Sequence, residues 1–276
     1  MPYERIKFYQ TGSFAAGNRL LPDDLRSVQS DVGRSNALTC GHRACQGCGE
    51  ALGARYALDA VHRATGGNMI AVNATGCLEV FSTPFPQTSW QIAWLHSLFG
   101  NAPAVASGVA AALKAQGRTD IRVVGQGKNV PLIAMAHEIP YVATATVADL
   151  RDLEYKATRA MDFHGARYLH ILVPCPLGWG SSPADTVKVA RLATESGLFP
   201  VFEAEAGEVT SSTPIRHQVP VTDYMRIQAR YAHLFKPEPR TEVIERIQAA
   251  ADRNIRRFGL ASPGPERAEG SAPGKE

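Results

Sequence analysis

The chain has 276 residues, of which 45% are hydrophobic and 20% charged, and its formal net charge is +3. These values are ordinary for a globular protein, so they exclude a collagen-like chain, a coiled coil and a mainly disordered chain. A net charge this small does not indicate a nucleic-acid-binding protein. We therefore expect no nucleic-acid partner.

The longest stretch without a formal charge lies between Glu79 and Lys114. Prolines and polar residues interrupt it, so it lacks the roughly 20 continuous apolar residues that a membrane span needs. The first 20 residues contain Glu4, Arg5 and Lys7 and no apolar core typical of a secretory signal. We expect a cytoplasmic protein without a membrane span, in which the uncharged stretch is buried in a core or against another subunit.

Apolar periodicity predicts helices and strands that alternate along the chain. The predicted helices cover residues 50–64, 103–115, 130–137, 148–163, 184–194 and 241–258. The predicted strands cover residues 69–72, 121–124, 141–146, 168–173 and 198–202. This alternation predicts an α/β fold with a mostly parallel sheet flanked by helices.

Composition divides the chain into four parts. Residues 1–40 are polar with scattered aromatics and are interpreted as an N-terminal arm, and residues 41–208 contain the alternating helices and strands. Residues 209–262 form a C-terminal extension that ends in a helix. Residues 263–276 are rich in Pro, Gly, Glu and Lys, which is typical of a disordered tail.

The cysteines are Cys40, Cys45, Cys48, Cys77 and Cys175, an odd number that argues against a disulfide framework. The C-x-x-C at residues 45–48 precedes the first predicted helix, and alone it fits a zinc knuckle, a redox pair or half of an iron–sulfur site. Cys77 and Cys175 each follow a predicted strand. If those strands share one parallel sheet, the four thiols meet at its carboxyl edge and suit a [4Fe–4S] cluster or a zinc ion.

Other interpretations of these residues stay open. Cys77 and Cys175 can be small buried residues without a ligand role, and Cys40 has no partner and is interpreted as a plain thiol. Glu50 follows Cys48 by two residues at a helix start. It either interacts with the helix dipole or takes part in the site.

Three motifs resemble the β subunit of 2-oxoacid:ferredoxin oxidoreductases of the pyruvate type. They are GHRACQGCGE at residues 41–50, NATGCLEVFSTP at 73–84 and HILVPCPLGWG at 170–180. The resemblance runs from about residue 41 to residue 208. Residues 3–21 and 89–104 look most like the phenylglyoxylate dehydrogenase branch of this family.

The resemblance implies a thiamine-diphosphate-binding fold for residues 41–208 and an enzyme subunit. The implied reaction is oxidative decarboxylation of a 2-oxoacid, phenylglyoxylate in the narrower branch, to the acyl-CoA, with electrons passing to a [4Fe–4S] cluster. It also implies the site residues: Cys45, Cys48, Cys77 and Cys175 for the cluster, and Glu50, Gly76 and Cys77 for thiamine diphosphate.

The resemblance further implies partners. The glutamate that activates thiamine comes from an α or γ chain in this family, so no catalytic residue is expected here. A ferredoxin-like subunit, coenzyme A and a flavoprotein linked to NAD are the other implied partners.

One feature departs from the family. Its members carry a Gly-Asp-Gly motif and a later Asn that bind Mg²⁺, which holds the diphosphate, and such a hard cation needs oxygen ligands. Residues 125–127 read Gly-Gln-Gly, and Glu138 is the only carboxylate between Asp120 and Asp149. We therefore expect an internal segment to be missing between about 125 and 128.

Three interpretations of this departure stay open. The sequence omits part of the protein, the gene product carries a deletion, or the chain is a non-catalytic subunit. In the last case the cluster serves as an electron relay or the chain serves as a scaffold.

Overall fold

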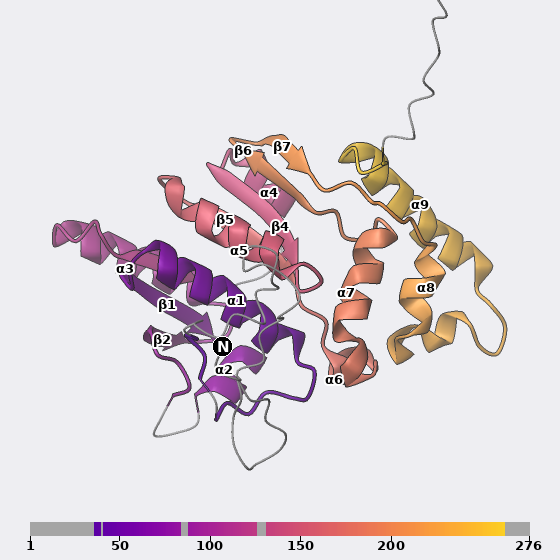
Figure 1. The fold of residues 1–276 in the computed structure, drawn as a ribbon, viewed down its shortest axis with the longest axis horizontal. Coiled ribbons are helices and arrows are strands. Elements are labelled where there is room, and N and C mark those ends of the chain that lie inside the picture. The colour runs from indigo at the N-terminus through magenta and orange to yellow at the C-terminus, as the bar shows by residue number, and fades with distance from the viewer. Residues whose placement is uncertain (1–35, 40, 84–87, 126–130, 263–276) are drawn as a thin grey trace, which may run out of the picture.

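The computed structural model describes residues 36–39, 41–83, 88–125 and 131–262 (Figure 1). The expectations for most of the N-terminal arm, for Cys40 and for a disordered tail at 263–276 concern residues outside these ranges. In the ranges that the structure describes, no helix is long and apolar enough to cross a membrane.

Helices and strands alternate through most of the described chain. The helices are α1 (Gly49–Ala64), α2 (Cys77–Ser82), α3 (Ala102–Ala115), α4 (Pro131–Ala136), α5 (Leu150–Arg159), α6 (Pro176–Trp179), α7 (Thr186–Glu195), α8 (Val221–Arg226) and α9 (Thr241–Arg257). The strands are β1 (Met69–Ala74), β2 (Ala93–Ser97), β3 (Arg122–Gly125), β4 (Tyr141–Thr146), β5 (Arg167–Leu172), β6 (Phe202–Glu205) and β7 (Glu208–Ser212). Short 3-10 helices occupy Ala160–Asp162, Pro183–Asp185 and Ala229–Leu234.

The strands form two sheets. The first has the order β2-β1-β3, with both pairings parallel. The second has the order β5-β4-β6-β7, in which β5 and β4 are parallel and the remaining pairings are antiparallel. The predicted α/β architecture with parallel strands and flanking helices is confirmed. The expectation that the strands before Cys77 and Cys175 share one sheet is wrong, because β1 and β5 belong to different sheets.

The predicted elements agree with the structure except at one strand. All six predicted helices and four of the five predicted strands are present, with shifted ends. The strand expected at 198–202 is wrong, because β6 begins only at Phe202. The residues before β6 belong instead to the turn that ends α7. In this turn Gly197 has φ +79°, and Phe199 N donates a hydrogen bond to Ala193 O (2.9 Å).

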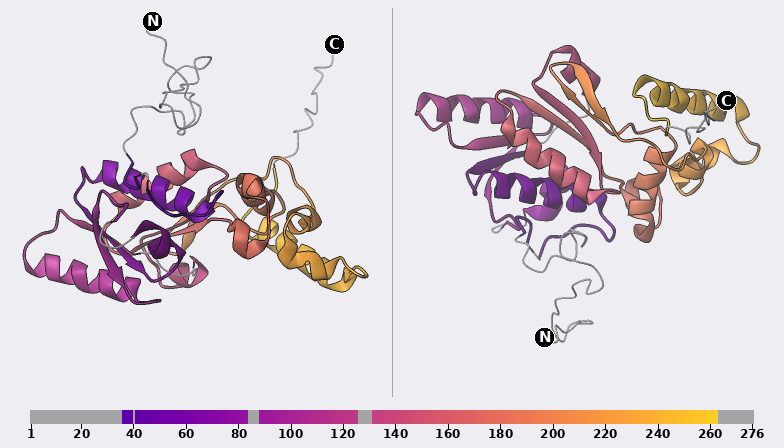
Figure 2. Two further views of the ribbon diagram at one scale, coloured as in Figure 1. Left: turned by 90° about the horizontal axis from the view of Figure 1, so that it is seen from below. Right: turned by 45° about the horizontal axis from the view of Figure 1, so that its top comes forward.

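Packing is deepest around β4, whose six residues are all buried. Helices α1 and α5 lie side by side (Figure 1). The C-terminal extension joins the second sheet, because Phe258 stacks on Phe202 of β6 with ring centroids 4.5 Å apart. Helices α3 and α9 lie at opposite ends of the molecule (Figure 2).

The extended uncharged stretch is only partly covered. Trp90 in this stretch is 5% exposed. Leu98, Phe99 and Val80, in contrast, are 76%, 72% and 67% exposed. The expectation that this stretch is buried in the core of the chain is therefore wrong for these side chains. Burial against another subunit stays a prediction.

A buried lysine provides a test of the packing of α5 on β4. Lys156 is 2% exposed, and its Nζ donates to Thr144 O (3.0 Å) and to Asp152 Oδ2 (2.8 Å). Replacing Lys156 by Met leaves a partly buried carboxylate unpaired, so we expect the free energy of unfolding to fall by about 3 kcal/mol. Urea denaturation measures this loss.

The exposed ion pair between Arg118 and Asp120 (3.3 Å) is the matched control. Its side chains are 55% and 53% exposed, so solvent screens the pair, and we expect Arg118→Met to leave the free energy of unfolding nearly unchanged. Equal losses for the two variants would contradict the importance of the Lys156 contacts.

Candidate functional site

The C-x-x-C motif forms a tight turn at the start of α1. Cys48 N donates to Cys45 O (3.1 Å), and Gly47 between them has φ +70°. Cys48 caps the helix, because its Sγ accepts a hydrogen bond from Ala51 N at 3.4 Å. The Cys48 thiol is therefore held at the backbone N–H groups of the first helical turn, which have no partner within the helix.

This turn is fastened to the segment that carries Cys175. Gly49 N donates to Pro174 O (3.2 Å), and Thr186 Oγ1 donates to Gly47 O (2.5 Å). A Cβ atom placed on Gly47 would lie 2.2 Å from Pro183 O, and one on Gly49 would lie 2.5 Å from Pro174 O. Only glycine permits this approach, so the sequence Gly47-Cys48-Gly49 brings the motif against the carboxyl end of β5.

Cys175 follows β5 and caps the short helix α6. Its Sγ accepts a hydrogen bond from Gly178 N at 3.3 Å, as the Cys48 sulfur does from Ala51 N. Cys77 is the first residue of α2 and directly follows β1 and Gly76. Cys45, Cys77 and Cys175 are exposed and Cys48 is half-buried, and all four are free thiols.

Electrostatic coupling places these groups in one neighbourhood. Burial raises the pKa of the Cys77 thiol. The negative charges of Glu50, Cys175 and Cys45 raise the same pKa further. Burial also raises the pKa of the Cys48 thiol, against the opposing hydrogen bonds from its backbone neighbours.

Glu50 links the first and second helices of the site. Burial raises the pKa of its carboxyl, and the backbone N–H of Leu78, the residue after Cys77, opposes this rise. Glu50 therefore lies close to the start of α2 as well as in the first turn of its own helix. An interaction with the helix dipole of α1 alone does not account for this position.

The four thiols share a neighbourhood without forming a closed ligand set. Throughout the described ranges, no three His, Cys, Asp or Glu side chains are close enough together to hold a metal ion. A set of four free thiols still has the donor chemistry of an iron–sulfur or zinc site. To bind one metal centre together, the four thiols would need to move closer to one another, and the exposed side chains of Cys45, Cys77 and Cys175 leave room for this.

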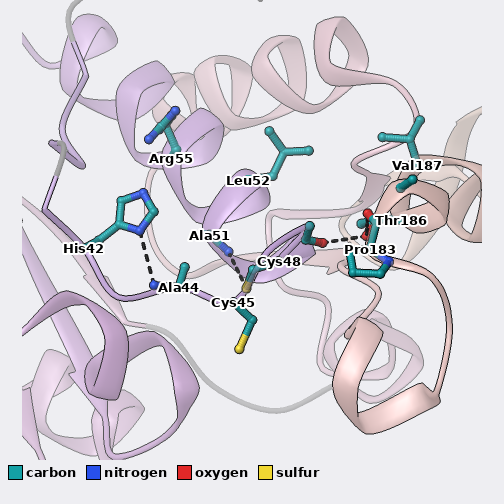
Figure 3. A pocket seen from close by; sticks show the side chains of 12 residues that line it. His42, Ala44, Cys45, Cys48, Ala51, Leu52, Arg55, Pro183, Thr186 and Val187 are labelled. Carbon is teal, nitrogen blue, oxygen red and sulfur yellow. Dashed lines mark hydrogen bonds between the residues drawn. The ribbon is translucent and has the colours of Figure 1, made fainter. Parts of the chain in front are cut away.

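A cavity of about 350 Å³ lies beside the C-x-x-C motif (Figure 3). His42, Arg55 and Thr186 line it together with Cys45 and Cys48. Burial lowers the pKa of His42, and the Arg55 charge lowers it further. The sequence analysis did not identify Arg55 or Thr186, because their place in the site depends on tertiary contacts.

Several curated proteins are similar to this chain, although no protein-family model matches it. Pyruvate synthase subunit PorB of Methanosarcina barkeri is 37% identical over 290 residues, covering 81% of this chain and 97% of the relative. The corresponding subunit of Methanothermobacter thermautotrophicus is 35% identical over 263 residues, covering 71% and 90%. Ketoisovalerate oxidoreductase subunit VorB of Pyrococcus abyssi is 28% identical, covering 72% and 86%.

A solved 2-oxoglutarate:ferredoxin oxidoreductase from Magnetococcus marinus is 19% identical and covers 49% of this chain and 65% of that chain. Its TM-score of 0.38 is too low to establish a shared fold.

The curated relatives define the class of protein as a subunit of a multi-subunit oxidoreductase. More narrowly, the chain belongs to the family of β subunits of 2-oxoacid:ferredoxin oxidoreductases. The resemblance seen in the sequence motifs is confirmed at this level. The narrower phenylglyoxylate branch stays a prediction.

The alignments show that the relatives contain residues that have no counterpart in this chain. The alignment with the Methanosarcina barkeri subunit runs over 290 residues, whereas 81% of this 276-residue chain is about 224 residues. About 66 aligned positions of the relative therefore have no counterpart in this chain. The Methanothermobacter thermautotrophicus alignment of 263 residues covers 71% of the chain, about 196 residues, and leaves about 67 positions unmatched.

The close approach at Gly47 yields a test of the site's architecture. We expect Gly47→Ala to lower the free energy of unfolding by about 2–4 kcal/mol, because the methyl group meets the Pro183 backbone and the residue also has positive φ. Urea denaturation measures the loss. Displacement of the turn should also change the rate at which Cys45 and Cys48 react with a thiol reagent.

Gly66 is the matched control, since it has φ +57° and an added Cβ would meet nothing within 4 Å. Gly66→Ala should therefore lower the free energy of unfolding by only about 1 kcal/mol, which is the cost of positive φ for a residue with a Cβ atom. A loss for Gly47→Ala no larger than this would show that the turn does not press against Pro183.

Proposed function

We propose that this chain carries a [4Fe–4S] cluster on Cys45, Cys48, Cys77 and Cys175 within a 2-oxoacid oxidoreductase complex. The complex is proposed to perform thiamine-diphosphate-dependent oxidative decarboxylation of a 2-oxoacid to its acyl-CoA. The observation that carries this proposal is the set of four free thiols on adjoining loops, in a chain that belongs to the β-subunit family. When bound, such a cluster accepts and donates single electrons.

The chain's own groups prepare the thiols for metal. Backbone N–H groups of Ala51 and Gly178 point at the sulfurs of Cys48 and Cys175, and such hydrogen bonds tune iron–sulfur centres. Metal ligands must be deprotonated, and burial raises the thiol pKa of Cys48 and Cys77. Loading of the cluster should therefore become faster as the pH rises toward those raised pKa values.

Glu50, Gly76 and Cys77 are the residues proposed to contact thiamine diphosphate. Glu50 already reaches the backbone next to Cys77. A Cβ on Gly76 would meet its nearest atom, Ala74 O, only at 3.9 Å, so the fold itself does not require glycine there. Open space beside Gly76 is consistent with a bound group.

The residues present do not fit the Mg²⁺ ion that would hold the diphosphate. Glu138, the only carboxylate between Asp120 and Asp149, follows the end of α4 at positive φ, among residues that turn the chain toward β4. A Mg²⁺ ion that holds the diphosphate would therefore need oxygen ligands from outside this stretch of the chain.

The proposed partners follow from the same family assignment. They are α and γ chains that supply the activating glutamate, a ferredoxin-like subunit, a flavoprotein linked to NAD, and coenzyme A, in a cytoplasmic complex. The exposed apolar side chains of Val80, Leu98 and Phe99 support a subunit interface on the side of β2 and α2.

Phenylglyoxylate is the proposed substrate, on the resemblance at residues 3–21 and 89–104. The relatives reported above are named for pyruvate and ketoisovalerate instead. We expect the complex purified from its native source to reduce an electron acceptor with phenylglyoxylate at a kcat/KM at least tenfold above that with pyruvate or 2-ketoisovalerate. A preference for either of the other acids would refute the substrate and leave the family assignment in place.

A non-catalytic electron relay is the second candidate function, and the missing Mg²⁺ ligands favour it. The two functions differ in cofactor content. Iron and sulfide together with thiamine in the purified complex support the enzyme, whereas iron and sulfide without thiamine support the relay.

Cysteine variants test the cluster directly. After anaerobic reconstitution with iron and sulfide, the chain should bind about four iron atoms and absorb near roughly 400 nm, with bleaching by dithionite. We expect Cys77→Ala and Cys175→Ala each to lose this absorbance and most of the iron. Iron analysis and absorbance spectra measure both effects.

Cys40→Ala is the matched control, because it removes a thiol that is not proposed as a ligand, and it should keep the iron. Full iron content in Cys77→Ala would refute the ligand assignment. A colourless protein that binds one zinc ion in place of iron would refute the cluster.

A further inference from the structure

The loop that carries Cys175 is held on both sides of the cysteine. Before it, Pro174 O accepts a hydrogen bond from Gly49 N (3.2 Å). After it, Gly180 O accepts a hydrogen bond from Ala229 N (2.9 Å), at the start of a 3-10 helix of the C-terminal extension. The first contact joins the loop to the C-x-x-C motif. The second joins it to a part of the chain that carries no cysteine.

Helix α6 lies between these two contacts and has only four residues. A helix this short is not stable by itself, because its few internal hydrogen bonds do not offset the ordering of its backbone. Cys175 caps its start, and it ends at Gly180 in the left-handed conformation (φ +64°, ψ +47°). The direction of the Cys175 thiol therefore depends on what packs against α6.

Arg230 of the C-terminal extension packs against the end of α6. Its Cζ atom lies over the Trp179 ring, 3.9 Å from the ring centroid. Trp is the best aromatic partner for such a cation–π contact, and Arg is the more frequent cation. The neighbouring residue Ala229 also lies close, since a Cβ atom on Gly180 would be 2.6 Å from the Ala229 Cβ atom. Two consecutive residues of the extension therefore cover the end of α6.

Arg230 is itself fixed by buried side chains. Its Nε donates to Gln228 Oε1 (2.9 Å), and a terminal guanidinium nitrogen donates to the Tyr224 hydroxyl (2.9 Å). Gln228 and Tyr224 are 1% and 7% exposed, and Gln228 Nε2 donates to Tyr224 O (2.5 Å). The two hydrogen bonds hold the planar guanidinium in one orientation, which the ammonium group of a lysine cannot reproduce.

The part of the extension that carries Arg230 has a core of its own. Met225 of α8 is buried in a cluster with Val189 of α7 and Ala251 of α9, and Trp179 packs against the same cluster. Helix α8 packs against both α7 and α9 (Figure 1). The extension is therefore a rigid support for α6.

We propose that Arg230 is a positioning residue for Cys175. Through its contact with Trp179, and with the hydrogen bond between Ala229 and Gly180, the C-terminal extension fixes α6 and so the direction of the Cys175 thiol. These contacts belong to the chain alone, whereas their consequence for a cluster rests on the proposed function. The other three proposed ligands lie before α1 and after β1, so loss of the Arg230 contact would displace one ligand of four.

Hydrogen exchange in the 276-residue chain tests the contact. The reporters are the N–H groups of Trp179, Gly180 and Ser181, which donate to Cys175 O and Pro176 O. In Arg230→Gln we expect these amides to exchange about tenfold faster, because α6 loses the cation that covers Trp179. Exchange in β4 is the internal reference and should change little.

Arg226→Gln is the matched control for this experiment. Arg226 lies in the same extension, with its Cζ atom 4.7 Å from the centroid of the Phe235 ring, so the variant also removes a cation–π contact. It should leave the exchange of the α6 reporters unchanged.

Reconstitution with iron and sulfide separates positioning from stability. We expect Arg230→Gln to release iron to an excess of chelator about tenfold faster than the unaltered chain. The EPR spectrum of its dithionite-reduced cluster should also change, because that spectrum depends on ligand geometry. Arg226→Gln should match the unaltered chain in both. Arg230→Lys keeps a cation but loses the two fixed hydrogen bonds, so its iron release should be intermediate.

Three results would overturn the proposal. They are unchanged exchange of the α6 reporters in Arg230→Gln, an equal change in Arg226→Gln, and unchanged iron release and EPR spectrum in cluster-loaded Arg230→Gln. If Arg230→Gln does not fold, Trp179→Phe weakens the same contact from α6 and is judged by the same amides. An unaltered chain that binds no iron would refute the cluster, and the exchange rates would then still decide the role of Arg230.

Discussion

The approach of the C-x-x-C turn to the end of β5 is the constraint on which the site depends. Gly49 N donates to Pro174 O, and Gly53 lies so close to Val173 that an added Cβ would be 2.6 Å from its side chain. These contacts connect α1, which covers the first sheet, to the carboxyl end of the second. Because no strand pairing joins the two sheets within the residues that the structure describes, this approach and the packing of α1 on α5 hold the cysteine loops in place.

The electrostatics of the site follow from that approach. Burial is the largest cause of the raised pKa of Cys77, and the negative charges of Glu50, Cys175 and Cys45 raise it further. A metal ion bound by these thiols, as proposed above, would be the largest local charge and would offset the repulsion that acts on Cys77.

Local patterns predicted most of the fold, and tertiary contacts decided the rest. The strand at residues 141–146 was predicted with its observed bounds because β-branched residues occupy every second position in it. Residues 198–201 are also apolar but belong to the turn that ends α7 at Gly197. The four cysteines proposed as ligands were singled out by their motifs and by the positions of Cys77 and Cys175 after strands, and their ligand role stays a prediction. Arg55 and Thr186 were not identified, because no local sequence pattern indicates that the turn before α1 contacts the start of α7 at Gly47. The division of the strands into two sheets was also not predicted, because apolar periodicity identifies strands but not which strands pair.

The two parts of the proposed chemistry therefore separate along the chain. The four cysteines and Glu50 lie on loops after β1, after β5 and at the start of α1, all within residues 45–175 and all present. Between Asp120 and Asp149, Glu138 is the only carboxylate, so that stretch lacks the oxygen ligands that a Mg²⁺ ion would need. The thiol loops are aligned by contacts elsewhere in the chain: the Gly49–Pro174 and Thr186–Gly47 hydrogen bonds and the packing of α1 on α5. The alignment of the proposed cluster site is therefore independent of the stretch in which a diphosphate-bound Mg²⁺ would be expected.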